Sequence, residues 1–157
     1  MKKGMRVVIS AEVPVWKREV RRLKRSVVRM LDMLAVGNSL EVSVALVDEE
    51  IIRELNRRYL NNDEPTDVLA FPLMSPDELA RLNKRAIVSP EPLGDIVICI
   101  PIAERQAAER NQKHYEEIEL LAAHGLLHLL GYEDETERGA GVMTAAEEQL
   151  LGRSIIR

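Results

Sequence analysis

The chain has 157 residues, one cysteine and a formal net charge of −4, which together describe a single domain large enough to bury a hydrophobic core. One cysteine excludes an intramolecular disulfide framework and is typical of a reducing compartment. No apolar run approaches the roughly 18 residues that a membrane span requires, and Glu12 and Pro14 interrupt the apolar stretch behind the basic N-terminal tip. We therefore expect one domain over 1–157 that is cytoplasmic, with no signal peptide and no membrane partner.

The charge is distributed unevenly along the chain. Residues 1–30 carry ten lysines and arginines against two glutamates, a net charge of +8, so the rest of the chain carries −12. An excess of this size favours an anionic partner, and the alternative is a helix face that is simply solvated. The candidate contacts to an anionic partner are Arg18, Arg21, Arg22 and Arg25.

The N-terminal half changes between strand-like and helix-like hydrophobic patterns. The predicted elements, in chain order, are a strand at 5–10, a helix from Pro14 to Gly37-Asn38, a strand at 40–47 and a helix at 49–59. Proline suits the first turn of a helix, and Gly-Asn suits its end. Asp48 is placed to cap the second helix through its carboxylate.

The C-terminal half contains two apolar strands followed by helices. The predicted elements are a strand at 67–73, a proline-containing connection at 73–93 with a helical turn near 77–84, a strand at 94–100, and helices at 102–112, 115–130 and about 142–151. This order predicts an α+β fold, in which a small mixed sheet of about four strands packs against helices.

The segment "AAHGLLHLLGYEDET" at 122–136 contains a candidate metal site. On a helix, His124 and His128 lie on one face with Cβ atoms about 6 Å apart, which lets two imidazoles converge on one cation. Gly131 can end this metal-binding helix with a left-handed cap that returns Asp134 toward the histidines. The spacing predicts one zinc ion per chain, held by His124, His128 and Asp134.

Gly125 lies inside the same helix, where glycine costs about 1 kcal/mol relative to alanine. Close approach of another backbone or of a substrate beside the metal would explain it, and so would helix–helix packing. The residue also separates this chain from zinc peptidases, in which a glutamate base directly follows the first histidine.

Three blocks of the chain resemble the YbeY family of bacterial metal-dependent endoribonucleases. They are "HGLLHLLGYEDE", "NRRYLNNDEPTDVLAFP" (56–72) and "LGDIVICI" (93–100), and Met143 and Glu147 fall where the family places a methionine and a glutamate. The resemblance implies a mixed α/β fold, a zinc ion held by three side chains and single-stranded RNA as substrate. It also implies a role in ribosomal RNA maturation and ribosome quality control, with the ribosome or ribosomal proteins as partners.

Two positions depart from the family pattern. The third metal ligand is usually a histidine in the family and is Asp134 here, whose carboxylate oxygen also binds zinc. An arginine often follows the tyrosine of the "NRRY" block, and here that position is Leu60. Arg58 is the nearby candidate for contact with RNA.

Three protein ligands leave a tetrahedral zinc ion with one position open to water. The nucleophile is then this water or the RNA 2′-hydroxyl, and the sequence leaves both open without naming a catalytic residue. Asp95, Glu133 and Glu135 are candidate carboxylates for the chemistry, and the alternative for each is a cap, turn or surface residue. Two other classes remain: a ribosome-associated factor with a structural zinc, for which Cys99 is the only soft fourth ligand, and a metalloprotease, which the missing glutamate disfavours.

Overall fold

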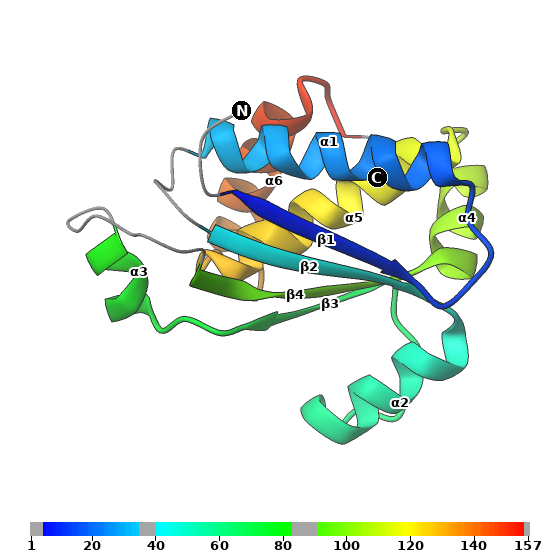
Figure 1. Ribbon diagram of the computed structural model, residues 1–157, viewed down its shortest axis with the longest axis horizontal. Coiled ribbons are helices and arrows are strands. Elements are labelled where there is room, and N and C mark those ends of the chain that lie inside the picture. Colours follow the sequence, from blue (N-terminus) through cyan, green and yellow to red (C-terminus); the bar gives the residue numbers. More distant parts are fainter. Residues whose placement is uncertain (1–4, 35–39, 83–90, 156–157) are drawn as a thin grey trace.

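The computed structural model describes residues 5–34, 40–82 and 91–155 (Figure 1). These residues form four strands and six helices. In chain order they are β1 (Arg6–Ala11), α1 (Lys17–Met33), β2 (Leu40–Val47), α2 (Glu49–Leu60), β3 (Val68–Pro72), α3 (Pro76–Leu82), β4 (Glu91–Cys99), α4 (Ile100–Glu109), α5 (His114–Leu129) and α6 (Glu137–Leu151). None of these helices is both long and apolar enough to cross a membrane.

The strands form one sheet in the order β1-β2-β4-β3. β1, β2 and β4 are parallel, and β3 pairs antiparallel with β4, so the sheet is mixed as the sequence predicts. Parallel neighbours need a crossover connection, which α1 provides between the first two strands. α1, α5 and α6 lie over one face of the sheet, and α2 extends from the other (Figure 1).

The main hydrophobic core lies between the sheet and the helices α1, α5 and α6. Helical spacing turns Leu23 and Val27 of α1 into this core, while the basic residues between them stay exposed. In β4 the side chains alternate between faces. Ile96 belongs to the main core, and Val97 belongs to a second, smaller cluster with Ile52 of α2.

Strand β4 begins earlier than its apolar run predicts. The prediction starts it at residue 94, whereas the strand extends back to Glu91 and includes Pro92. Its pairing with β2 shifts register between Glu41 and Val42, opposite this proline. Such a bulge accommodates a residue that has no N–H group to donate to the ladder.

The other predicted boundaries in the first half are close to the observed ones. α1 begins at Lys17, so Pro14 precedes the helix and does not lie in its first turn. The predicted end at Gly37-Asn38 lies outside the described residues. The short helix α3 occurs where a helical turn is predicted near 77–84.

Helix α6 begins at Glu137, well before the predicted start near residue 142. Thr136 caps it, because its hydroxyl oxygen accepts a hydrogen bond from the Gly139 N–H at 2.9 Å. Gly139 and Gly141 lower the helix propensity of this first part, which explains why the sequence pattern places the start too late.

Candidate metal centre

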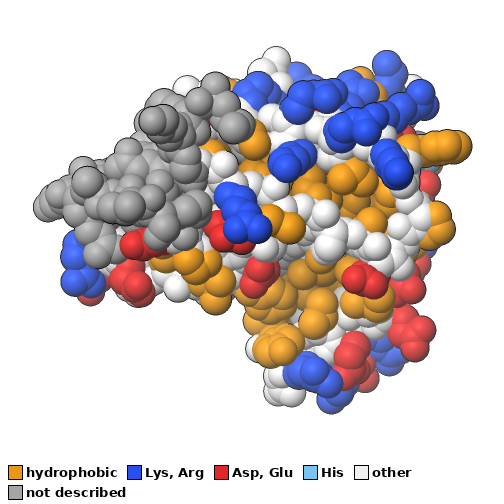
Figure 2. All heavy atoms as spheres, in the orientation of Figure 1, with side chains coloured by type: hydrophobic (Ala, Val, Ile, Leu, Met, Phe, Trp, Pro, Cys, Tyr) orange, Lys and Arg blue, Asp and Glu red, His pale blue; other side chains and the backbone are white. Residues whose placement is uncertain are grey.

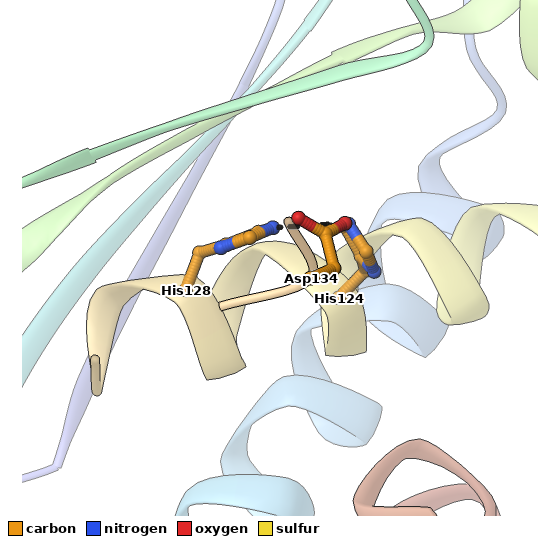
Figure 3. A group of neighbouring side chains, drawn as sticks. All are labelled: His124, His128 and Asp134. Atoms are coloured by element: carbon orange, nitrogen blue, oxygen red, sulfur yellow. Dashed lines mark hydrogen bonds and ion pairs between the residues drawn. The ribbon is translucent and has the colours of Figure 1, made fainter. Parts of the chain in front are cut away.

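The end of α5 has the cap that the sequence predicts. Gly131 has φ +97°, in the left-handed region that favours glycine. Its N–H donates to the His128 carbonyl at 3.0 Å, and the Tyr132 N–H donates to the Leu127 carbonyl at 3.0 Å. These two bonds define a Schellman motif. The chain reverses here and brings Asp134 back over the face of α5 that carries His128 (Figure 3).

Three potential ligand atoms converge beside α5 (Figure 3). The Nε2 atoms of His124 and His128 are 3.1 Å apart. Oδ2 of Asp134 lies 3.4 Å from Nε2 of His124 and 3.7 Å from Nε2 of His128. A tetrahedral zinc ion with bonds of about 2.0–2.1 Å separates its ligand atoms by roughly 3.3 Å. The donor set and its spacing therefore fit a zinc ion.

The protein holds the other ring nitrogen of each histidine. Nδ1 of His124 lies 2.9 Å from Oε2 of Glu147, a buried carboxylate on α6. Nδ1 of His128 lies 3.0 Å from the carbonyl oxygen of Tyr132. With the proton on Nδ1, each ring donates to its acceptor and leaves the lone pair of Nε2 directed at the shared point.

A hollow of about 280 Å³ opens beside His124. Its walls also contain the charged side chains of Asp67, Arg110, Glu117, Asp134 and Glu147. A molecule that reaches a cation at the three ligand atoms would therefore enter a space with polar and charged walls.

The other carboxylates and the cysteine singled out in the sequence lie elsewhere. The Glu133 side chain accepts hydrogen bonds from the Thr136 hydroxyl and from the backbone N–H groups of Thr136 and Glu135, which together lower its pKa. Asp95 lines a different hollow, on the α2 side of the sheet. Cys99 is buried in the second cluster, and burial raises the pKa of its thiol. Within the described residues, no fourth side chain joins the three ligand candidates.

The basic residues of α1 gather along one edge of the molecule (Figure 2). The four predicted contacts to RNA on this helix are all exposed: Arg18, Arg21, Arg22 and Arg25. The guanidinium of Arg22 lies over the ring of Tyr115, 3.3 Å from its centroid. Tyr115 precedes His124 on α5 by nine residues, which is about two and a half turns. The basic face and the histidines therefore lie on opposite sides of α5.

The two positions discussed for the "NRRY" block lie at the end of α2. Arg58 is exposed and lies 3.6 Å from a carboxylate oxygen of Glu54. Leu60 is also exposed. Neither residue lines the hollow beside His124.

Gly125 allows close packing of α5 on the sheet. A Cβ atom at this position would lie 2.7 Å from Cγ2 of Ile96 in β4. The sequence offered close approach of a backbone or substrate, or helix–helix packing, as explanations. The contact is instead between the helix and a strand side chain, and it lets α5 lie close to β4.

The fold and the site together define an α+β protein in which two histidines and a carboxylate are close enough to hold one metal ion. The family model described as "Endoribonuclease YbeY" matches residues 9–154, and the chain belongs to this family. The resemblance predicted from the three sequence blocks is therefore confirmed.

Relatives that carry the same family name agree with this assignment, and a solved structure shares the fold. An "Endoribonuclease YbeY" from Geobacillus thermodenitrificans is 47% identical over 118 residues, which covers 75% of each chain. Another from Moorella thermoacetica is 41% identical over 143 residues, which covers 90% of each. The solution structure of TM1509 from Thermotoga maritima aligns with a TM-score of 0.60 and 29% identity, over 93% of this chain and 89% of that one.

Two contacts beside the candidate ligands are not predicted from the sequence. The contact of Glu147 with His124 is one, because Glu147 is placed only by resemblance. The contact of Glu117 with Arg110 is the other. The signal in the sequence is a carboxylate on an apolar helix face. Glu147 follows the buried Met143 by one turn, and Glu117 lies on the face of α5 that also carries Leu121 and His124. A buried carboxylate requires a partner, so such positions indicate contacts that spacing alone does not identify.

Proposed function

We propose that the protein is a zinc-dependent, single-strand-specific endoribonuclease that acts in ribosomal RNA maturation and ribosome quality control. One zinc ion per chain is held by His124, His128 and Asp134. The observation that carries this proposal is the spacing of the three ligand atoms, between 3.1 and 3.7 Å, in a member of the endoribonuclease YbeY family.

The side chains of the site suit hydrolysis of a phosphodiester. A bound zinc ion stabilises charge on a phosphoryl oxygen and lowers the pKa of a water molecule. His124 and His128 are kept in position by the acceptors at their Nδ1 atoms. Their side chains are 20% and 30% exposed and that of Asp134 is 42% exposed, so the ligand atoms lie at the surface, where a flexible strand can reach them.

The basic face of α1 supports RNA as the substrate. Its exposed arginines attract the phosphate backbone without regard to sequence, and Arg58 of α2 is included as a weaker candidate. Because the basic face and the histidines lie on opposite sides of α5, an RNA chain that contacts both curves around this helix.

The proposal includes a ribosomal partner and therefore a cytoplasmic location. A hollow of about 550 Å³ on the α2 side of the sheet is lined in part by Leu55, Tyr59 and Phe71. Tyr59 is 60% exposed, and an exposed apolar surface of this kind is typical of a protein contact. Co-sedimentation with ribosomal subunits tests the proposed ribosomal partner, and Tyr59→Ala should reduce the amount of protein that co-sediments.

The central test measures the zinc content of the purified protein and its cleavage of single-stranded RNA. The wild type should bind one zinc ion per chain, and His128→Ala should lose most of the zinc and the cleavage. His114→Ala is the matched control, because His114 is exposed and lies 3.5 Å from Glu104, away from the site. An unchanged zinc content in His128→Ala would contradict the site.

The two other classes considered for the sequence have less support. A structural zinc site is closed by a fourth protein ligand, and Cys99 does not belong to the group formed by the described residues. A metalloprotease of this helix type needs a glutamate after the first histidine, and that residue is Gly125.

A further inference from the structure

The hollow beside His124 has one lysine or arginine among the described residues that line it. This residue, Arg110, lies at the C-terminal end of α4. Its Nη1 atom lies 2.7 Å from both carboxylate oxygens of Glu117 on α5. The Arg110 side chain is 26% exposed, whereas the Glu117 side chain is completely buried. The ion pair therefore has its carboxylate in the interior and its guanidinium at the wall of the hollow.

Glu117 and His124 lie on the same face of α5. Seven residues separate them, which is close to two full turns, so their side chains leave the helix in nearly the same direction about 10 Å apart along its axis. Glu117 thus holds the guanidinium of Arg110 at a fixed distance from the three ligand atoms. One phosphate is too small to span this distance, so Arg110 and a cation at the ligand atoms would contact different phosphates of one strand.

The ion pair leaves most of the guanidinium donors available. Among the described residues, Nη1 is the one side-chain nitrogen of Arg110 with a hydrogen-bond acceptor, and none of these residues accepts from Nε or Nη2. An arginine has five N–H donors in a planar fork that matches the oxygens of a phosphate. Because Glu117 already orders this side chain, little rotational freedom is lost when a phosphate binds.

We propose that Arg110 binds a phosphate of the RNA strand that neighbours the phosphate at the metal centre, with Glu117 as its positioning residue. This assignment rests on the proposed ribonuclease function. The other charged side chains of the wall are carboxylates, which repel a phosphate, so a strand that enters the hollow is directed to Arg110. The competing interpretation is that Arg110 only neutralises the buried Glu117.

The test compares variants of the full, zinc-loaded chain in binding a short single-stranded 2′-O-methyl oligonucleotide over a range of salt concentrations. Arg110→Gln alone removes the guanidinium that lies against the buried carboxylate of Glu117, which can impair folding. The decisive variant therefore combines Arg110→Gln with Glu117→Gln and keeps a neutral amide pair. Arg105→Gln is the matched control, because Arg105 lies on the same helix in an exposed ion pair with Glu49 at 2.7 Å.

The double variant should bind zinc normally and lose oligonucleotide affinity roughly tenfold, the size of one charged hydrogen-bonded contact. The slope of log affinity against log salt should fall by about 0.7, as expected for one phosphate contact of a single strand. With unmodified RNA, KM should rise while kcat stays nearly constant, since the contact is not at the scissile bond. Arg105→Gln should behave like the wild type in all three measurements.

Two outcomes overturn the assignment while leaving the proposed function intact. One is a double variant that keeps both wild-type affinity and the wild-type salt slope, which makes Arg110 a counterion of Glu117 only. The other is loss of zinc together with RNA binding, which makes the pair a support of the metal centre. A wild-type chain that binds zinc but neither binds nor cleaves RNA overturns the proposed function itself, and the role of Arg110 with it.

Discussion

His124 and His128 differ in what holds the ring nitrogen that turns away from the shared point. His128 faces a neutral backbone carbonyl, whereas His124 faces the carboxylate of Glu147. A carboxylate partner fixes the orientation and the tautomer of the imidazole, so it favours a bond from the other ring nitrogen to a metal. Since Glu147 lies on α6, this contact also ties the last helix to the metal centre.

Glu147→Gln should lower zinc affinity by about 10- to 100-fold while the helices stay folded. The glutamine fills the same volume but carries no negative charge and can present either an oxygen or an amide group to Nδ1. Competition with a zinc chelator measures the affinity. Glu148→Gln is the matched control. It removes the charge of the neighbouring carboxylate, which accepts a hydrogen bond from the Ile155 N–H and is not the partner of His124. Equal affinities in the two variants would show that Glu147 does not act through the histidine.

Asp134→Asn should also weaken zinc binding, because a neutral amide oxygen is a poorer donor than a carboxylate. Asp134→His should retain zinc, since it restores a nitrogen ligand at the same position. Glu135→Gln is the control, because Glu135 is exposed and is not one of the three ligand candidates. If Asp134→Asn binds zinc as tightly as the wild type, Asp134 is not a ligand.

At the scale of residues, the sequence predicts contacts between residues that are close together along the chain. The three candidate ligands lie within 124–134, and one helix with its C-terminal cap determines their relative positions. Periodicity and cap chemistry suffice for such a segment. Glu147, which contacts His124, and Arg110, which contacts Glu117, come from neighbouring helices. The packing between helices is not encoded in any local pattern.

At the scale of elements, the contact between α5 and β4 makes the strongest demand on side-chain size. Gly125→Ala should lower the free energy of unfolding by about 1–3 kcal/mol, because the added methyl group overlaps Ile96. Gly141→Ala in α6 is the matched control: its Cβ meets nothing within 4 Å, and the higher helix propensity of alanine should stabilise the protein by up to about 1 kcal/mol. Denaturant unfolding of both variants measures the two changes. Equal stabilisation by both would mean that α5 does not pack closely on β4.

The elements themselves were predicted well where one pattern continues without interruption. β2 occupies the predicted residues 40–47, and Asp48 caps α2 by accepting from the Ile51 N–H at 2.9 Å. The starts of β4 and α6 were wrong for different reasons. The extension of β4 depends on a bulge in this strand, where Glu41 of β2 pairs with Pro92, Val42 pairs with Gly94 and Leu93 is the extra residue. The start of α6 contains two glycines that the Thr136 cap compensates.

At the scale of the whole molecule, the basic face of α1 and the three candidate ligands lie on opposite sides of α5. Replacement of Arg18, Arg21, Arg22 and Arg25 by glutamine should reduce RNA affinity and flatten its salt dependence, by about 0.7 in log–log slope for each phosphate that the helix no longer neutralises. Arg53→Gln with Arg57→Gln is the control on α2, because both residues are exposed and already paired, with Asp63 and Glu54. An unaltered slope in the α1 variant would mean that this helix face is only solvated.

The short chain segment that contains all three candidate ligands has a consequence for how the protein opens. Closing a loop of this length costs little entropy, so metal release need not disturb the sheet. Removal of zinc should therefore be a local event, in which the amides of 131–137 exchange with solvent faster while those of β2 and β4 keep their protection. Hydrogen exchange with and without a chelator would detect it. Faster exchange confined to these amides would define the end of α5 and the start of α6 as a unit that opens while the rest of the molecule stays folded.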